Sequence, residues 1–158
     1  MMKTLSHNRN GTGIFALRTQ KNLEHVANSA INGEDVHPVT QAILALLGIV
    51  IFPWETSAFD IVKKSTLPAL SANGWPRWKM SGARRVIELG DLIEVLRNAI
   101  AHGNIEFDSD SIRPADVAIS FTNIPKGKKT SDWVGTIMGD QLIDFCCLFS
   151  SAIQDQVG

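Results

Sequence analysis

The chain has 158 residues, which is long enough for one domain with its own hydrophobic core and short for two. Apolar residues make up 44% of it and charged residues 20%, as in an ordinary soluble globular protein. The formal net charge is −1, so any binding to nucleic acid has to come from local basic patches. The longest apolar run, residues 42–52, falls well short of the roughly 20 residues that cross a bilayer.

No apolar stretch follows the lysine near the N-terminus, so we expect no signal peptide, no membrane partner and a cytoplasmic location. The only two cysteines, Cys146 and Cys147, are adjacent and lie within an apolar pattern. That environment predicts small core residues rather than metal ligands or a redox pair. The sequence therefore predicts no metal site and no cofactor.

Apolar residues occur at helical spacing in several segments of the chain. The predicted helices cover residues 14–31, 38–52, 56–64 (a weaker pattern), 81–101 and 140–154. The second of them is apolar on nearly every side, which predicts a central, buried helix. Residues 1–13 are expected to be flexible, and residues 65–80, which contain proline and glycine, are expected to form a loop.

The pattern changes after the fourth predicted helix. Residues 105–107 are short and extended, residues 117–122 alternate between apolar and polar side chains, and residues 133–137 are rich in strand formers. We expect a small antiparallel sheet or hairpin inserted at residues 104–138, before the last helix. The predicted fold is mostly α, a single domain over residues 1–158 with four main helices and this β insertion.

One candidate functional motif lies at the end of the helix predicted over 81–101: Arg97-Asn98-Ala99-Ile100-Ala101-His102, followed by Gly103. Gly103 is well placed as the left-handed residue that ends a helix. Arginine offers a rigid fork of donors that suits a phosphate, and histidine has an ordinary pKa near neutral pH. This combination suits cleavage of RNA without a metal ion, the histidine transferring protons and the arginine stabilising charge at the phosphorus.

The spacing of the motif sets a geometric condition. At about 100° per residue, Arg97 and His102 lie about 140° apart on a helix, whereas Asn98 and His102 lie about 40° apart. Asn98 is therefore expected to orient the imidazole of His102. Arg97 and His102 reach one substrate if the helix unwinds at residues 101–103, or if two copies of the chain pair so that both motifs line a shared cleft.

A structural role for the motif is the simpler alternative, with His102 capping the last helical turn and Arg97 paired with Glu94. Trp75 and Trp78 are candidates for base stacking or for anchoring a loop to the core. Two groups of basic residues are candidates for contacts with nucleic acid or are solvated surface. They are Arg77, Lys79, Arg84 and Arg85 in one, and Lys126, Lys128 and Lys129 in the other.

The string from Leu96 to Asn104 resembles the motif of the HEPN superfamily (higher eukaryotes and prokaryotes nucleotide-binding). That motif consists of an arginine, a polar residue, and a histidine four to six positions after the arginine. The resemblance extends over approximately residues 38–155. An apolar helix ending in Phe-Pro-Trp-Glu, the motif at the end of a later helix, a β-hairpin and a closing helix after Trp133 look like a plasmid-associated branch of the superfamily.

The resemblance implies an antiparallel helical bundle that forms a homodimer, with the two motifs meeting across the interface. It implies a metal-independent endoribonuclease that acts on RNA as a toxin, in antiviral defence or in RNA processing, and it leaves room for an antitoxin or a partner from a neighbouring gene. By motif position, Arg97 and His102 are catalytic and Asn98 supports them. Because some members lack activity, a catalytically silent module that binds nucleotide, RNA or a partner protein is the alternative, and a purely structural dimer is a third.

Overall fold

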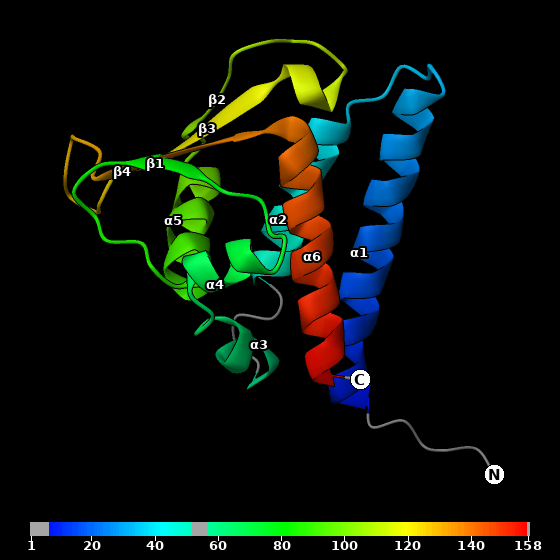
Figure 1. The fold of residues 1–158 in the computed structure, drawn as a ribbon, viewed down its shortest axis with the longest axis horizontal. Helices are drawn as coiled ribbons and strands as arrows, with labels where there is room; N and C mark the ends of the chain where they lie inside the picture. The colour runs from blue at the N-terminus through cyan, green and yellow to red at the C-terminus, as the bar shows by residue number, and fades with distance from the viewer. Residues whose placement is uncertain (1–6, 52–56, 158) are drawn as a thin grey trace.

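The computed structural model of the protein describes residues 7–51 and 57–157, and helices predominate in these ranges (Figure 1). The mostly-α class predicted from the sequence is confirmed. The helices are α1 (His7–Ile31), α2 (Pro38–Ile51), α3 (Ser57–Val62), α4 (Leu67–Ala72), α5 (Leu89–Ala101), the short 3₁₀ helix η1 (Pro114–Asp116) and α6 (Gly139–Val157). The strands are β1 (Lys79–Ser81), β2 (Ile105–Phe107), β3 (Ala118–Asn123) and β4 (Trp133–Met138).

The helices pack on one another and on one face of the sheet. α1 and α6 lie side by side, and α2 contacts both of them (Figure 1). The described strands form an antiparallel sheet in the order β1-β4-β3-β2. Alternate residues of β3 and β4 are buried and the residues between them are part-buried, so one face of the sheet packs on the core and the other is partly open to solvent. α5 contacts both α2 and β3, and it therefore connects the helices to the sheet.

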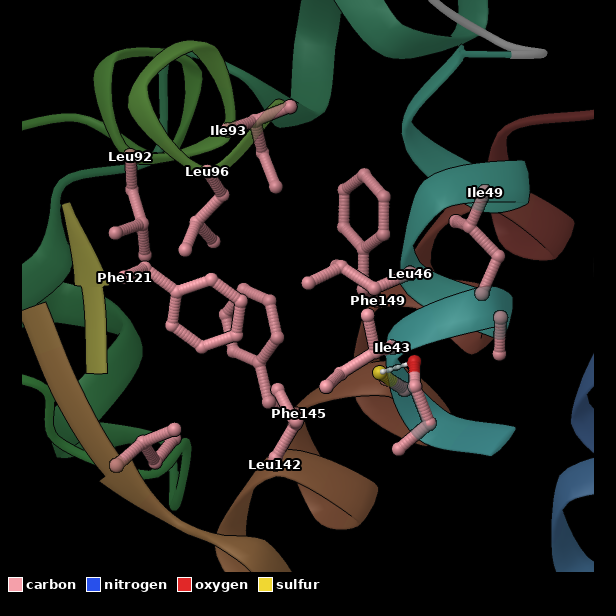
Figure 2. Packing of buried hydrophobic residues seen from close by; sticks show 14 of the residues in the cluster. Ile43, Leu46, Ile49, Leu92, Ile93, Leu96, Phe121, Leu142, Phe145 and Phe149 are labelled. Atoms are coloured by element: carbon pink, nitrogen blue, oxygen red, sulfur yellow. Dashed lines mark hydrogen bonds between the residues drawn. The ribbon is translucent and has the colours of Figure 1, made fainter. Parts of the chain in front are cut away.

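A shared apolar core joins these elements (Figure 2). Phe145 and Phe149 of α6 stack with ring centroids 6.3 Å apart, and Phe59 of α3 meets Phe149 edge-on at 5.9 Å. Figure 2 shows Leu96 of α5 and Phe121 of β3 turned toward the same cluster. α5 contributes six buried side chains to the core: Leu89, Leu92, Ile93, Val95, Leu96 and Ala99.

Two long helices begin at residues other than those predicted. α1 begins at His7, so residues 7–13 are helical rather than a flexible loop, while residues 1–6 lie outside the described ranges. The glycines and asparagines of residues 7–13 have weak helix propensity, so the local sequence does not predict a helix there. α5 begins at Leu89 rather than at residue 81. Its apolar periodicity also begins at Leu89, so the earlier start has no support in the pattern.

Residues 65–80, predicted to be a loop, contain α4 and the start of β1. The Thr66 hydroxyl accepts a hydrogen bond from the N–H of Ala69 at 3.4 Å and so caps α4, while a proline occupies its first turn. β1 pairs with β4, with Lys79 opposite Thr136. The sheet therefore includes a strand from outside the predicted insertion at residues 104–138.

The other predicted elements are confirmed within three residues at each end, and residues 52 and 56 lie outside the described ranges. α2 is central, as predicted, but one side of this helix is exposed to solvent. Ala42 and Leu46 are fully buried, while Leu44 is 58% exposed. In the part of the chain that the structure describes, no helix has both the length and the hydropathy that crossing a membrane requires.

Trp75 and Trp78 anchor the segment before β1 to the core. The ring of Trp75 meets that of Phe145 edge-on at 5.6 Å, and Trp78 meets Phe121 and Phe145 at 5.6 and 5.5 Å. Both indoles are part-buried and packed against the core cluster. Of the two alternatives that the sequence left open for these tryptophans, loop anchoring is the one that the contacts support.

The two cysteines are core residues, as predicted. Cys146 is buried and its thiol donates to the carbonyl oxygen of Ala42 at 3.5 Å, while Cys147 is half-buried. Burial raises the pKa of both thiols, that of Cys147 to about 11. Because the thiolate is the reactive form, both side chains are poor nucleophiles at neutral pH.

Leu96→Ala and Leu44→Ala are the same chemical change in two environments. Leu96 is fully buried, so we expect Leu96→Ala to lower the free energy of unfolding by about 2–5 kcal/mol. Leu44 is 58% exposed, so Leu44→Ala should change that free energy by less than about 0.5 kcal/mol. Denaturant titration followed by circular dichroism measures both values. Equal losses in the two variants would contradict the core as described.

Candidate functional site

Hydrogen bonds at the N-terminal end of α5 define where the motif-bearing helix begins. Glu88 and Asp91 form a capping box. The Asp91 carboxylate accepts hydrogen bonds from the backbone N–H groups of Ile87 at 3.1 Å and Glu88 at 3.0 Å. These donors have no partner within the helix, so the carboxylate satisfies groups that a helix end leaves open. The cap is the local reason that α5 begins at Leu89.

The C-terminal end of α5 carries the motif and stays helical up to His102. The N–H of His102 donates to the carbonyl oxygen of Asn98 at 3.1 Å, which is the ordinary helical hydrogen bond. Gly103 then adopts the left-handed conformation, with φ of +68°, and the N–H of Asn104 donates to the carbonyl oxygen of Ala99 at 2.8 Å. This is the Schellman arrangement that ends many helices. His102 is the C-cap residue, as the structural alternative predicted.

The buried face of α5 fixes the directions of the motif side chains. α5 is regular up to Ala101, and His102 keeps the helical hydrogen bond to Asn98, so the described chain does not adopt the unwound form that was one of the two alternatives. At about 100° per residue, Arg97 leaves α5 on one flank of the buried face and His102 on the other, about 140° away. Asn98 and His102 share a side of the helix. Within one chain, the arginine and the histidine of the motif therefore point in different directions.

Asn98 and His102 line an open hollow of about 660 Å³ beside the end of α5. Asn104 forms another part of its wall, and residues 124–128, in the connection between β3 and β4, form the rest. His102 is exposed and Asn98 is half-buried. Arg97, which is also half-buried, is not among the residues that line this hollow. The structure thus brings two of the three predicted site residues to one surface.

A backbone hydrogen bond holds the two walls of the hollow together. The N–H of Thr122, in β3, donates to the carbonyl oxygen of Asn104 at 3.0 Å. Residues 124–128 follow directly, so β3 places them beside the end of α5. The sequence identified the lysines here only as one of two basic groups, because their position relative to the motif depends on how the sheet docks against the helix.

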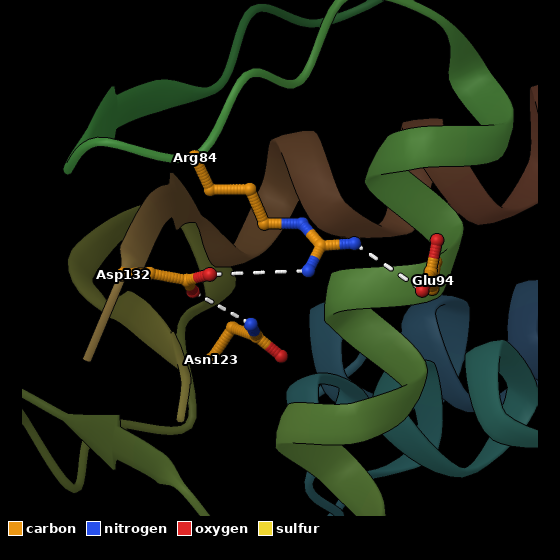
Figure 3. A network of polar contacts seen from close by, with 4 residues as sticks. All are labelled: Arg84, Glu94, Asn123 and Asp132. Atoms are coloured by element: carbon orange, nitrogen blue, oxygen red, sulfur yellow. Dashed lines mark hydrogen bonds and ion pairs between the residues drawn. The ribbon is translucent and has the colours of Figure 1, made fainter. Parts of the chain in front are cut away.

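An ion-pair network centred on Arg84 fixes the base of the same connection (Figure 3). The Arg84 guanidinium lies 3.2 Å from the carboxylate of Glu94 on α5 and 3.8 Å from that of Asp132. Asp132 also accepts a hydrogen bond from the side-chain amide of the buried Asn123 at 2.7 Å. Glu94 thus pairs with Arg84. Arg84, predicted to be part of a basic patch, connects α5 to the β3–β4 hairpin.

In the ranges that the structure describes, no group of three or more histidine, cysteine, aspartate or glutamate residues is placed to hold a metal ion.

Comparisons with known proteins identify the family. The model of the family described as HEPN pEK499 p136 matches residues 2–158, nearly the whole chain. No curated protein and no solved structure shows significant similarity to the chain.

Asp91→Ala removes the acceptor for two backbone N–H groups at the start of α5. We expect it to lower the free energy of unfolding by about 1 kcal/mol, measured by thermal or denaturant unfolding. Asp91→Asn is the matched control, because its amide oxygen still accepts a hydrogen bond, and its loss should be smaller. Equal losses in both variants would show that the negative charge, rather than the hydrogen bonds, stabilises this end of the helix.

Proposed function

Because the chain belongs to the HEPN pEK499 p136 family, we propose that it is an endoribonuclease whose site consists of Arg97, Asn98 and His102. The observation that carries the proposal is the position of the motif. It lies at a helix end, where Asn98 and the exposed His102 border an open hollow. RNA is the substrate, and the working form is a homodimer.

The dimer follows from the directions of the motif side chains. One chain turns Arg97 and His102 about 140° apart on an intact helix, so a second chain is the remaining way to bring both to one phosphate. Two copies related by a two-fold axis present the same surface to each other. Pairing along the outer face of α5 then sets Arg97 of one copy near His102 of the other. An RNA phosphodiester bound in the shared cleft then contacts the Arg97 guanidinium of one copy and the His102 imidazole of the other.

In the proposed reaction, the 2′-hydroxyl of the ribose attacks the adjacent phosphorus. A neutral His102 imidazole accepts the hydroxyl proton, and the same imidazole, now protonated, donates a proton to the departing 5′-oxygen. Arg97 stabilises the additional negative charge on the phosphoryl oxygens. The P–O5′ bond breaks, and the products carry a 2′,3′-cyclic phosphate and a 5′-hydroxyl. Asn98 holds the imidazole in a productive orientation.

A second candidate function is an RNA-binding module without turnover. It is favoured by the separation of Arg97 from the hollow that Asn98 and His102 line within one chain. If the chains do not pair, that hollow offers an imidazole and amides to RNA but no arginine. Such a module would bind RNA in a salt-sensitive way and leave it intact.

Incubation of the purified protein with single-stranded RNA in excess chelator should yield fragments with 2′,3′-cyclic phosphate ends. We expect His102→Ala to lower the cleavage rate at least about 100-fold, because it removes the group that transfers the proton. His25→Ala is the matched control, since His25 is exposed on α1, away from the motif. Gel electrophoresis with analysis of the product ends measures both. Cleavage that persists in His102→Ala, or that requires a divalent ion, would contradict the proposal.

Mixing two inactive variants tests whether the site is shared between chains. Arg97→Ala and His102→Ala should each be inactive alone. After subunit exchange, half of the dimers are mixed and each holds one intact site out of two, so activity should recover to about a quarter of the wild-type value. If Arg97 and His102 act within one chain, the mixture stays inactive. Light scattering on each variant shows whether dimers form.

A further inference from the structure

The connection between β3 and β4 contains a tight turn that presents two lysines. The N–H of Lys128 donates to the carbonyl oxygen of Pro125 at 3.0 Å and closes the turn. Gly127, at the third position, has a φ of +76°, a conformation that the turn requires and that glycine adopts without strain. Lys126 and Lys128 flank this glycine and are exposed. Residues 125–128 are called the lysine turn below.

The lysine turn faces the motif and is held there from two sides. It forms one wall of the hollow that Asn98 and His102 line. On one side, β3 is bound to the end of α5 through the Thr122–Asn104 hydrogen bond. On the other, the network around Asp132 fixes the residue that precedes β4. In Figure 1 the connection between β3 and β4 lies beside α5, on the opposite side of the molecule from α1.

The hollow concentrates positive charge in a chain whose net charge is only −1. Its ionisable lining residues are all basic: His102, Lys126 and Lys128. Three carboxylates belong to the elements that form the hollow: those of Asp91 and Glu94 on α5 and that of Asp132 before β4. The Arg84 guanidinium lies 3.2 Å from Glu94 and 3.8 Å from Asp132, and the Asp91 carboxylate accepts hydrogen bonds from the backbone at the opposite end of α5. Because each carboxylate already has a donor as its partner, the three compete little with a bound anion. A phosphate is the ligand that such a lining suits.

We propose that the lysine turn binds the RNA phosphate adjacent to the phosphodiester that is cleaved at His102. The inference rests on the proposed function for the identity of the ligand. Lysine attracts phosphate as a point charge and does not distinguish bases, so this contact positions the strand without selecting a sequence. Ile124, which is 37% exposed, and Pro125 add apolar surface against which a ribose or base can pack. Both lysines are positioning residues and take no part in the chemistry.

The test measures binding of a fluorescent single-stranded RNA by anisotropy over a range of salt concentrations. All variants carry His102→Ala, so that cleavage does not interfere. The test variant is Lys126→Gln/Lys128→Gln. The matched control is Lys21→Gln/Lys64→Gln, which removes the same charge from exposed lysines on α1 and after α3. A third variant, Lys126→Arg/Lys128→Arg, restores the charge.

We expect the glutamine pair in the lysine turn to weaken binding about threefold to tenfold. The slope of log Kd against log salt should fall by about 0.7 for each phosphate of the single strand that the variant no longer neutralises. The control pair should leave both quantities close to their starting values, and the arginine pair should restore them. Circular dichroism checks that every variant is folded. Equal effects of the two glutamine pairs would overturn the inference, because overall charge rather than a local interaction would then explain the binding.

The outcomes separate this inference from the nuclease proposal. If the protein with His102 intact cleaves RNA but the lysine-turn variant binds like the control, the inference is overturned and the nuclease proposal stands. If RNA binds through the lysine turn and the protein with His102 intact does not cleave it, the inference stands and the nuclease proposal is overturned. If the wild-type chain binds no RNA, both are overturned.

Discussion

Burial of one face of α5 in the core fixes the orientation of the candidate site. Leu92, Ile93 and Leu96 are completely buried in the shared core, where α5 contacts α2 and β3. Each is worth about 1.5–3 kcal/mol relative to an exposed position, so rotation of the helix about its axis would be costly. The rotational position of the helix about its axis determines where every other residue of α5 points. The directions of Arg97 and His102 are therefore consequences of core packing.

The second wall of the site depends on the same packing through the sheet. Phe121 of β3 is buried in the core, and its strand is hydrogen-bonded to Asn104, immediately after the helix. The network of Arg84 with Glu94 and Asp132 then connects the hairpin to α5 a second time. A helix end and a hairpin turn, from separate parts of the sequence, are thus held in a fixed relation. The hollow between them is the surface at which we propose that a phosphate backbone binds.

Several elements could be predicted because their signals are local in the sequence. The apolar periodicity of Leu89 to Ala99 predicted the buried face of α5, and Gly103 predicted its end, because both depend on residues within a few positions of one another. The motif and its resemblance to a family also needed no structure, since residue types and their spacing carry them. The angular separation of Arg97 and His102 followed from helix geometry alone.

Contacts between distant segments could not be predicted from local patterns and become visible in the folded chain. β1 has three residues and becomes a strand only by pairing with β4, and residues 7–13, whose own helix propensity is weak, extend a helix that packs against α6. The ion pair of Arg84 with Glu94 and the position of Lys126 and Lys128 beside His102 likewise depend on docking of the hairpin against α5. Local propensities are worth fractions of a kcal/mol per residue, and the burial of a core is worth far more. Long-range packing therefore overrides the local pattern wherever the two disagree.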